Sequence, residues 1–287
     1  YCKVEVKAGG GPIIPTETSF MSRPELLAGI RLACQLKIKE NLEIVLPEDL
    51  LAVKEYRATV SLVKELTYDI KEVNFQLIEP VEIKHRPGQY VQIMAQGPEG
   101  PVFRAYSISS PSSKHDGIQL IVRLVPEGIA STYIHNLKEG DEVIFTGPYG
   151  EFRLSENPNT EIICVGGGAG MAPISCIIHS IYEKWPDRSC HLYFGCRSMK
   201  DVFYLDDFQK LAAKHPNLKI HYALSEPSEV DKWDGDTGFI HLSVDKWIKD
   251  DEKRQAFLCG PPPMIDAVTE VLKEKHLKDG EIFYDKF

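Results

Sequence analysis

Residues 104–110, with the sequence RAYSISS, carry side chains that could bind a planar, anionic cofactor. Arg104 can donate two parallel hydrogen bonds to a phosphate, and Tyr106 offers a flat apolar ring with a polar tip. The serines that follow add small hydroxyl groups. These residue types predict a flavin site. An ordinary strand that ends in a turn at Pro111 fits the same residues equally well, so the decision depends on the rest of the chain.

A second candidate is the glycine-rich stretch GGGAGMAP at residues 166–173, which follows the apolar run EIICV. Glycines let the backbone approach a pyrophosphate, whose charge meets the free N–H groups and the positive dipole end of the following helix. The third glycine of the GxGxxG fingerprint is missing, and Pro173 opens the helix instead. We therefore predict a dinucleotide site that departs from the usual spacing.

Three further loops follow apolar runs: YFGCR at 193–197, LSEP at 224–227 and CGPPPM at 259–264. Isoleucines recur at helical spacing between the first two runs, so strands alternate with helices and the expected sheet is parallel and doubly wound. Ligands bind at the carboxyl ends of such strands. The loops are therefore expected to share one binding edge.

The pattern between residues 58 and 145 is different, because apolar residues recur there at every second position. This period predicts an antiparallel barrel. Within it, GIASTY at 128–133 combines a glycine with short hydroxyl residues and could present backbone N–H groups to a phosphate at a helix start. A plain strand-to-helix turn is the alternative.

Composition limits the possible partners. The chain has 287 residues, enough for about two domains, and a net charge of −9, which argues against nucleic acid or an anionic membrane as partner. The longest apolar run, 162–178, is broken by four glycines and a proline, so we expect no transmembrane segment. Seven cysteines without a CxxC pair suggest a reducing compartment and no zinc site. We expect a cytoplasmic protein, at the cytoplasmic face of a membrane if an N-terminal anchor is missing.

The motifs RAYS, GxxS, GGGAGMAP and CGPPPM, in this order over residues 56–287, resemble the ferredoxin reductase superfamily. Ahead of them, CKVEV, GGG, PTE and RLACQL resemble the C-terminal half of a plant-type 2Fe-2S ferredoxin. The closest subgroup is that of the flavoprotein F subunits of sodium-translocating NADH:quinone reductases, with related oxygenase reductase components. The resemblance implies an α/β plus all-β chain: a partial β-grasp ferredoxin domain at 1–54, a FAD-binding barrel at 55–154 and a doubly wound NAD-binding domain at 155–287.

The resemblance also implies roles for single residues. The FAD site would comprise Arg104, Ala105, Tyr106, Ser107, Gly128, Ala130 and Ser131. The NADH site would comprise Gly166, Gly167, Gly168, Ala169, Gly170, Pro173, Gly195, Arg197, Ser225, Glu226, Cys259, Gly260 and Pro261. Three of the implied residues are catalytic: Ser107 near the flavin N5, Cys259 beside the nicotinamide, and the cofactor-binding Phe287 over the flavin face. A buried core thiol and a packed strand end are the alternatives for Cys259 and Phe287.

Cys2 and Cys34 would match the third and fourth ligands of the 2Fe-2S cluster. Two small buried thiols are the alternative. The first two ligands would lie upstream of Tyr1, so we expect the cluster to be incomplete or absent in this chain.

We expect an NADH-dependent FAD oxidoreductase that passes electrons singly to a 2Fe-2S cluster and then to a quinone or a ferredoxin-type protein. Its alternatives are the reductase component of an oxygenase and a non-catalytic flavin or nucleotide sensor. NADH is preferred over NADPH because Glu226 would repel a 2′-phosphate. Arg197 complicates this expectation, since it could meet that phosphate or pair with Asp201 or Glu226.

Overall fold

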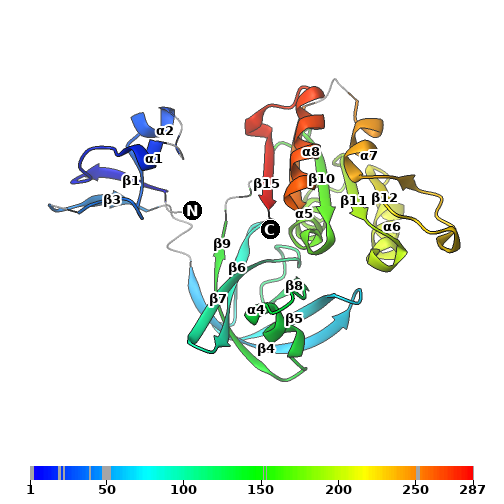
Figure 1. The fold of residues 1–287 in the computed structure, drawn as a ribbon, viewed down its shortest axis with the longest axis horizontal. Helices are drawn as coiled ribbons and strands as arrows, with labels where there is room; N and C mark the ends of the chain where they lie inside the picture. The colour runs from blue at the N-terminus through cyan, green and yellow to red at the C-terminus, as the bar shows by residue number, and fades with distance from the viewer. Residues whose placement is uncertain are drawn as a thin grey trace. The chain divides into compact units, whose positions relative to one another are not determined.

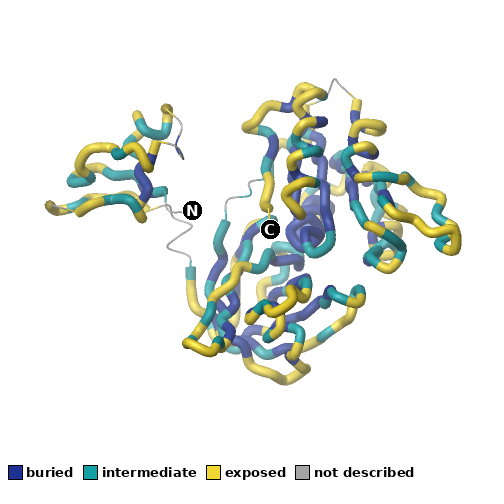
Figure 2. The backbone as a smooth tube through the Cα atoms, in the orientation of Figure 1, coloured by how far each residue is buried: buried dark blue, intermediate teal, exposed yellow. Residues whose placement is uncertain are grey.

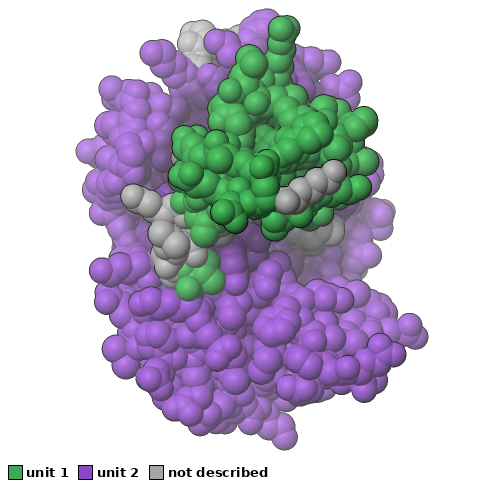
Figure 3. Space-filling model, turned by 90° about the vertical axis from the view of Figure 1, so that its left-hand side faces the viewer, with its two compact units in different colours: residues 1–53 green, residues 54–287 purple. Residues whose placement is uncertain are grey.

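The computed structural model describes residues 3–18, 21, 23–38, 40–46, 53–150, 152, 154–249 and 253–286. The chain divides into two compact units, Tyr1–Val53 and Lys54–Phe287, which Figure 3 distinguishes by colour. No helix within the described residues is both long enough and apolar enough to cross a membrane.

Unit 1 is built on a three-stranded antiparallel sheet in the order β2-β1-β3. Its elements are β1 (Lys3–Ala8), α1 (Pro15–Thr18), α2 (Arg23–Leu27), β2 (Ile30–Leu32) and β3 (Glu43–Val45). Its buried apolar side chains are few, among them Val4, Met21 and Leu32. Where the resemblance implied a partial β-grasp domain, the structure has this small antiparallel sheet.

A buried ion pair supports this small core. The Arg31 Nη2 atom lies 2.7 Å from the Glu17 Oε2 atom, and both side chains are buried. The guanidinium also donates hydrogen bonds to the carbonyl oxygens of Gly10, Gly11 and Pro12. Arg31 thereby ties the glycine-rich turn after β1 to the sheet, with its charge paired and its donors satisfied.

Unit 2 begins with a six-stranded antiparallel sheet in the order β7-β6-β9-β4-β5-β8 (Figure 1). Its elements are β4 (Lys54–Glu65), β5 (Ile70–Glu79), β6 (Tyr90–Gly97), β7 (Gly100–Ser107), β8 (Gly117–Arg123), α4 (Ile129–Asn136) and β9 (Glu142–Tyr149). Alternate residues of β6, such as Val91, Ile93 and Ala95, are fully buried. The period-two pattern in the sequence therefore reports one inward face.

The sheet is a half-barrel, where the sequence predicted a closed barrel. Its two edge strands are β7 and β8, and they meet only beyond the end of β7. There Ile108 forms an isolated bridge with Leu120, and the Ser109 N–H donates to the Gln119 carbonyl at 2.8 Å. Pro111 follows shortly and has no N–H to continue the ladder in that direction.

The second half of unit 2 is a six-stranded parallel sheet in the order β13-β12-β11-β10-β14-β15. The strands are β10 (Glu161–Gly167), β11 (Cys190–Cys196), β12 (Leu218–Leu224), β13 (Asp236–Thr237), β14 (Arg254–Gly260) and β15 (Ile282–Lys286). The main helices are α5 (Met171–Lys184), α6 (Leu205–Lys214), α7 (Ile240–Trp247) and α8 (Pro262–Glu274), with short 3₁₀ turns η1 (Gly168–Gly170), η2 (Met199–Asp201), η3 (Glu229–Asp231) and η4 (Asp279–Glu281). The predicted parallel sheet is confirmed; the two-residue β13 was not predicted.

Helices cover both faces of this sheet. The side chains of α5 and α6 share one apolar cluster with the strands, and those of α7 and α8 share the other. The central strand β10 is therefore buried at every residue (Figure 2), which is why its sequence EIICV reads as one apolar run. From β10 the chain builds β11 and β12 on one side and then crosses to place β14 on the other. The strand order thus reverses beside β10, where sheets of this kind hold ligands.

Candidate functional site

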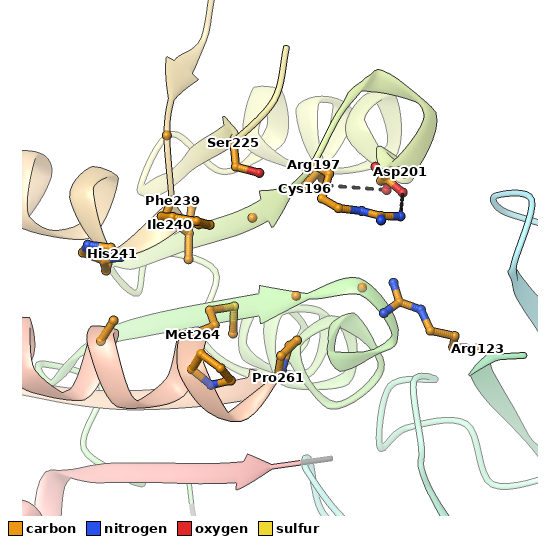
Figure 4. A pocket seen from close by; sticks show the side chains of 16 residues that line it. Arg123, Cys196, Arg197, Asp201, Ser225, Phe239, Ile240, His241, Pro261 and Met264 are labelled. Atoms are coloured by element: carbon orange, nitrogen blue, oxygen red, sulfur yellow. Dashed lines mark hydrogen bonds and ion pairs between the residues drawn. The ribbon is translucent and has the colours of Figure 1, made fainter. Parts of the chain in front are cut away.

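A cavity of about 400 Å³ lies at the carboxyl ends of β10, β11, β12 and β14 (Figure 4). Six of the predicted residues line it: Gly167, Gly168, Gly195, Arg197, Ser225 and Pro261. The predicted residues Gly166, Ala169, Gly170 and Pro173 are all described and are not among its lining residues. The four loops expected to share one edge of the sheet therefore do so.

Two glycines of the GGGAG stretch are required by geometry. Gly168 has a φ of +55°, and a Cβ atom there would lie 2.4 Å from the Arg123 Nη2 atom. A Cβ atom at Gly170 would lie 2.1 Å from the carbonyl oxygen of Cys259. Because that second contact is with backbone, it cannot be relieved by a side-chain rotation. Gly170 thus lets the loops after β10 and β14 pack together beneath the cavity.

Arg123 is a lining residue that the sequence did not indicate. It ends β8 of the half-barrel and reaches the loop after β10, where Figure 4 shows its guanidinium beside the cavity. Its Nε atom lies 3.2 Å from the Asp69 Oδ2 atom, and about a third of its side chain is exposed. A cation held against Gly168 can meet a phosphate that binds to the backbone of this loop. The only signal in the sequence was a basic residue ending an apolar strand.

The remaining walls of the cavity are largely apolar. Phe239 and Ile240, where β13 leads into α7, face Met264 and Pro261 at the start of α8 (Figure 4). Phe239 is 68% exposed and belongs to none of the apolar clusters, so most of its ring surface is open to a ligand. Such walls can hold the flat rings of a dinucleotide while the cations hold its phosphates. Phe239 and Ile240 follow β13, the strand that the sequence did not predict.

Cys259 is the second-last residue of β14, near the carboxyl end of the strand, and is almost fully buried. Burial, and secondarily the nearby Asp285 carboxylate, raises the pKa of the Cys259 thiol well above its ordinary value. Asp285 is its partner in the β14–β15 ladder, and burial raises the pKa of Asp285 as well. The next predicted residue, Gly260, has a φ of +153° and packs near Gly167. The thiol is therefore neutral at ordinary pH, a packing group and weak hydrogen-bond donor.

The RAYS residues occupy β7, the edge strand of the half-barrel. Arg104 and Ala105 are exposed, while Tyr106 and Ser107 are partly buried. The Arg104 guanidinium donates to the Phe103 carbonyl at 2.8 Å, and burial raises the pKa of Tyr106 to about 12, with Arg104 opposing the change. The exposed Arg104 thus lies close to the neutral Tyr106 on β7, an edge strand that has a neighbouring strand on one side only.

Helix α4 contacts β7 and begins directly after Gly128. No described side chain caps its first turn. The Ser131 hydroxyl instead accepts a hydrogen bond from the Val125 N–H at 3.1 Å and donates to the Gly128 carbonyl at 3.2 Å, which closes the loop before the helix. Ala130 is buried beside it. Free backbone N–H groups at this helix start can bind a phosphate.

Two family models match the chain: the oxidoreductase FAD-binding domain over residues 57–154 and the oxidoreductase NAD-binding domain over residues 164–270. The chain belongs to the ferredoxin reductase family. It is an NAD(P)H-dependent flavin oxidoreductase with binding domains for FAD and NAD(H).

Curated relatives of the reductase align along its whole length. The F subunit of the Na(+)-translocating NADH-quinone reductase of Haemophilus ducreyi is 36% identical over 329 positions, which cover 100% of this chain and 80% of the relative. Its counterpart of the same name in Yersinia enterocolitica is 35% identical and is covered to 81%. The alignments are longer than the chain, so these relatives carry insertions that the reductase lacks.

Solved structures give the same result. The cytochrome P450 reductase GcoB from Amycolatopsis superposes with a TM-score of 0.80 at 28% identity, covering 100% of this chain and 86% of that one. The ferredoxin reductase in carbazole 1,9a-dioxygenase superposes with a TM-score of 0.74 at 26% identity, covering 100% and 85%. The fold therefore accompanies several electron-transfer reductases.

The residues of the half-barrel fit FAD. The exposed Arg104 and the uncapped start of α4 can share the two phosphates of a pyrophosphate, and the ring of Tyr106 can lie against a flavin ring. A flavin held along β7 would leave the cavity beside β10 for the dinucleotide. Arg123, at the end of β8, brings the half-barrel to the wall of that cavity.

The described residues of unit 1 do not fit a 2Fe-2S cluster. Cys34 is exposed in the turn after β2, and the other predicted ligand, Cys2, lies outside the described residues, as does Phe287. Residues 1–53 contain these two cysteines where a plant-type cluster needs four. Within the described ranges, no group of His, Cys, Asp or Glu could hold a metal ion.

Proposed function

We propose that the reductase binds FAD, prefers NADH over NADPH, and delivers electrons one at a time to an external acceptor. The observation that carries this proposal is the cavity at the strand-order reversal, lined by the GGGAG loop and entered by Arg123 of the half-barrel. A dinucleotide held there is bound by both halves of unit 2. When bound, FAD accepts a hydride from NADH and gives up the two electrons singly.

The protein's own contribution is placement and the exclusion of water. In our proposal, Arg104 and the backbone at Gly128, Ala130 and Ser131 hold the FAD pyrophosphate, and Ser107 donates a hydrogen bond near the flavin N5. Gly167, Gly168 and Arg123 hold the NADH pyrophosphate. Arg104 is exposed and Gly168 has a positive φ, as these contacts require.

In our proposal, Cys259 and Gly260 form the nicotinamide end, and Phe287, which lies outside the described residues, would cover the flavin face. The Cys259 thiol is neutral, but it is almost fully buried in the apolar cluster of α5 and α6 and does not line the dinucleotide cavity, which equally fits the alternative of a core thiol. Asp285 is a candidate hydrogen-bond partner for the nicotinamide that the sequence did not indicate. Although the residue is exposed, desolvation raises the pKa of the Asp285 carboxyl, so it holds a proton to higher pH than an ordinary aspartate.

Glu226 supports the preference for NADH. Ser225 lines the dinucleotide cavity, and the exposed Glu226 lies directly after it at the end of β12. A carboxylate can accept hydrogen bonds from the ribose hydroxyls of NADH and repels the 2′-phosphate of NADPH. Arg197 does not offset it in the structure, because its guanidinium pairs with Asp201.

The test is flavin reduction by each nucleotide under anaerobic conditions. We expect kcat/KM for NADH to exceed that for NADPH by roughly a hundredfold, and Glu226→Arg to reduce this ratio strongly. An exposed glutamate outside the cavity, replaced as Glu270→Arg, is the matched control. Equal rates with both nucleotides in the unaltered protein would contradict the preference.

The acceptor is the second part of the proposal. The names of the relatives supply two candidates: a quinone reductase assembly, and an oxygenase system such as those of the P450 and carbazole enzymes. We propose unit 1 as the module on the acceptor side, with a 2Fe-2S relay between FAD and the acceptor if the two missing thiolates are supplied. Two cysteines cannot supply the four thiolates that such a cluster needs.

A further inference from the structure

Tyr204 has a backbone conformation that tyrosine seldom adopts. It directly precedes α6 with a φ of +59°, in the left-handed region that favours glycine, and it is half-buried. The other described non-glycine residues with a positive φ, which are Glu127, Lys232 and His276, are all exposed. Such a conformation persists only where surrounding contacts hold it, and at Tyr204 several of those contacts come from the half-barrel.

The Tyr204 hydroxyl donates a hydrogen bond to the Glu72 Oε2 atom on β5. Glu72 is buried, and its other carboxylate oxygen, Oε1, accepts a hydrogen bond from the Asn74 amide at 3.0 Å. Burial, and then the hydrogen bond to Glu72, raises the pKa of the Tyr204 phenol, so the phenol keeps its proton and remains the donor. Each oxygen of this buried carboxylate thus has a donor, and Tyr204 supplies one of them.

The ring of Tyr204 is also in contact with both halves of unit 2. Lys64, the partner of Glu72 in the β4–β5 ladder, places its Nζ atom 5.9 Å from the centre of the ring. Phe203 and Phe208 contact the ring edge-on, at centroid separations of 5.2 and 6.2 Å. The Tyr204–Glu72 contact therefore joins the half-barrel to the start of α6 through a residue whose ring and backbone are both constrained.

The two residues lie beside elements that form the dinucleotide cavity. The connection between β11 and α6, which ends at Tyr204, also carries Asp201, a lining residue of the cavity. On the other side of the contact, Glu72 pairs with Ile121 of β8, two residues before Arg123, which lines the same cavity. The Tyr204–Glu72 contact thus connects one wall of the cavity to the strand that supplies another.

The relative position of the two halves of unit 2 matters for the proposed reaction. The half-barrel would hold the flavin and the cavity would hold the nucleotide, so hydride transfer needs the two halves in register. A misplacement of about 1 Å can lower such a rate by about a hundredfold. A contact that fixes one half against the other therefore acts mainly on the rate of transfer, and little on the affinity for the nucleotide.

We propose that Tyr204 is a positioning residue of the reductase: its contact with Glu72 fixes the β11–α6 connection against the half-barrel and so aligns the dinucleotide with the flavin. This inference rests on the proposed transfer of a hydride from NADH to FAD. Neither Tyr204 nor Glu72 lines the dinucleotide cavity, so both act through the residues that do.

The experiment is Tyr204→Phe, which removes the hydroxyl and keeps the ring. Stopped-flow flavin reduction of the FAD-loaded protein over a range of NADH concentrations separates the limiting rate from the dissociation constant. We expect the limiting rate to fall by about tenfold or more, while the dissociation constant for NADH changes by less than about threefold. A purely structural role would lower the unfolding temperature without this division between rate and affinity.

Hydrogen exchange of the FAD-loaded protein without nucleotide gives a readout that does not depend on activity. The Val202 N–H donates to the Met199 carbonyl at 3.3 Å, and the Phe208 N–H donates to the Tyr204 carbonyl at 2.9 Å. Both amides should exchange about tenfold faster in Tyr204→Phe, because local opening of this connection becomes easier. Amides in the middle of β10 should exchange as in the parent protein.

Two variants serve as matched controls. Tyr182→Phe removes a hydroxyl from the same apolar cluster, but this hydroxyl donates to the Arg188 carbonyl at 3.2 Å, within the nucleotide-binding half. It should leave the limiting rate and the exchange of the Val202 and Phe208 amides unchanged. Glu72→Gln keeps an oxygen for the Tyr204 hydroxyl, so its limiting rate should stay within about threefold of that of the parent protein.

Tyr204→Phe leaves one oxygen of the buried Glu72 without its donor, which can prevent folding. In that case Tyr204→Phe combined with Glu72→Met breaks the same contact and leaves no unpaired buried charge. Its limiting rate should also fall by about tenfold or more. A limiting rate within about threefold of the parent's in a folded variant without the contact, or unchanged exchange of the Val202 and Phe208 amides, overturns the proposal. An equal loss of rate in Tyr182→Phe overturns it as well.

A failure of the proposed function gives a different result. If NADH does not reduce the flavin of the parent protein, while Tyr204→Phe speeds the exchange of the Val202 and Phe208 amides, the contact between the halves stands and the proposed reaction is wrong. If NADH reduces the flavin equally fast in the parent protein and in Tyr204→Phe, the reaction stands and the positioning role is wrong.

Discussion

Replacing Arg123 with glutamine tests whether the half-barrel contributes directly to nucleotide binding. Arg123 is the half-barrel's lining residue in the dinucleotide cavity, and its guanidinium lies against Gly168. Charge-assisted hydrogen bonds contribute about 1.5–3 kcal/mol each, which corresponds to roughly 10- to 150-fold in a dissociation constant. About a third of the Arg123 side chain is exposed, so solvent screens its charge and the expected loss of NADH affinity lies toward the lower end of this range.

A second effect increases the expected loss of NADH affinity and so opposes the reduction by solvent screening. Without Arg123, the Asp69 carboxylate loses its partner at 3.2 Å and stays near the entering pyrophosphate. We therefore expect the dissociation constant for NADH to rise by about 10- to 50-fold. The limiting rate of flavin reduction should change little, because a phosphate contact stabilises the ground state and the transition state equally.

The assay is stopped-flow flavin reduction over a range of NADH concentrations, which separates binding from the limiting rate. Arg57→Gln is the matched control, since Arg57 is an exposed arginine on β4 that does not line the cavity. Both variants should unfold at the same temperature as the parent protein. A change in the dissociation constant smaller than about threefold, or a loss confined to the limiting rate, would refute the role of Arg123.

Three further predictions concern FAD, unit 1 and iron. Arg104→Ala should weaken FAD binding by about tenfold or more, and denatured parent protein should release FAD and not FMN. Arg31 lowers the pKa of Glu17 to about 2 from an ordinary 4.5, so the folded form binds fewer protons and unit 1 should lose stability as pH falls through that interval. The NMR signals of Val4 and Leu32 report the urea concentration at which unit 1 is half unfolded, and this midpoint should fall with pH. Glu17→Gln should abolish the pH dependence, and a pH-independent midpoint in the parent protein would contradict the prediction. The 287-residue chain should carry no 2Fe-2S cluster, and stoichiometric iron with acid-labile sulfide would show that Cys2 and Cys34 are misassigned.

The parallel sheet and its binding edge could be predicted because each follows from local pattern. After Glu161, the run IICV is apolar since β10 is covered on both faces, and glycines mark the points where the backbone must approach another chain segment. Gly167, Gly168 and Ser225 were therefore placed at the cavity from the sequence alone. Local periodicity is sufficient for such features because their causes are local.

The residues that the sequence missed depend on contacts between distant segments. Arg123 enters the dinucleotide cavity because the end of β8 packs against the loop after β10, and no local pattern reports that approach. Phe239 follows β13, a strand of two residues that is too short to show a period. The sequence left Arg197 with two possible acidic partners. Only the three-dimensional structure pairs it with Asp201.

The most direct test of the central claim is rapid anaerobic mixing of the FAD-loaded protein with NADH while the visible absorbance of the flavin is recorded. If the dinucleotide cavity and the half-barrel form one reductase site, the flavin should bleach completely, at a rate that saturates as the NADH concentration increases. At the same concentration of NADPH, the rate of bleaching should be lower. A flavin that stays oxidised with both nucleotides, although each binds, would contradict the account and indicate a non-catalytic flavin sensor.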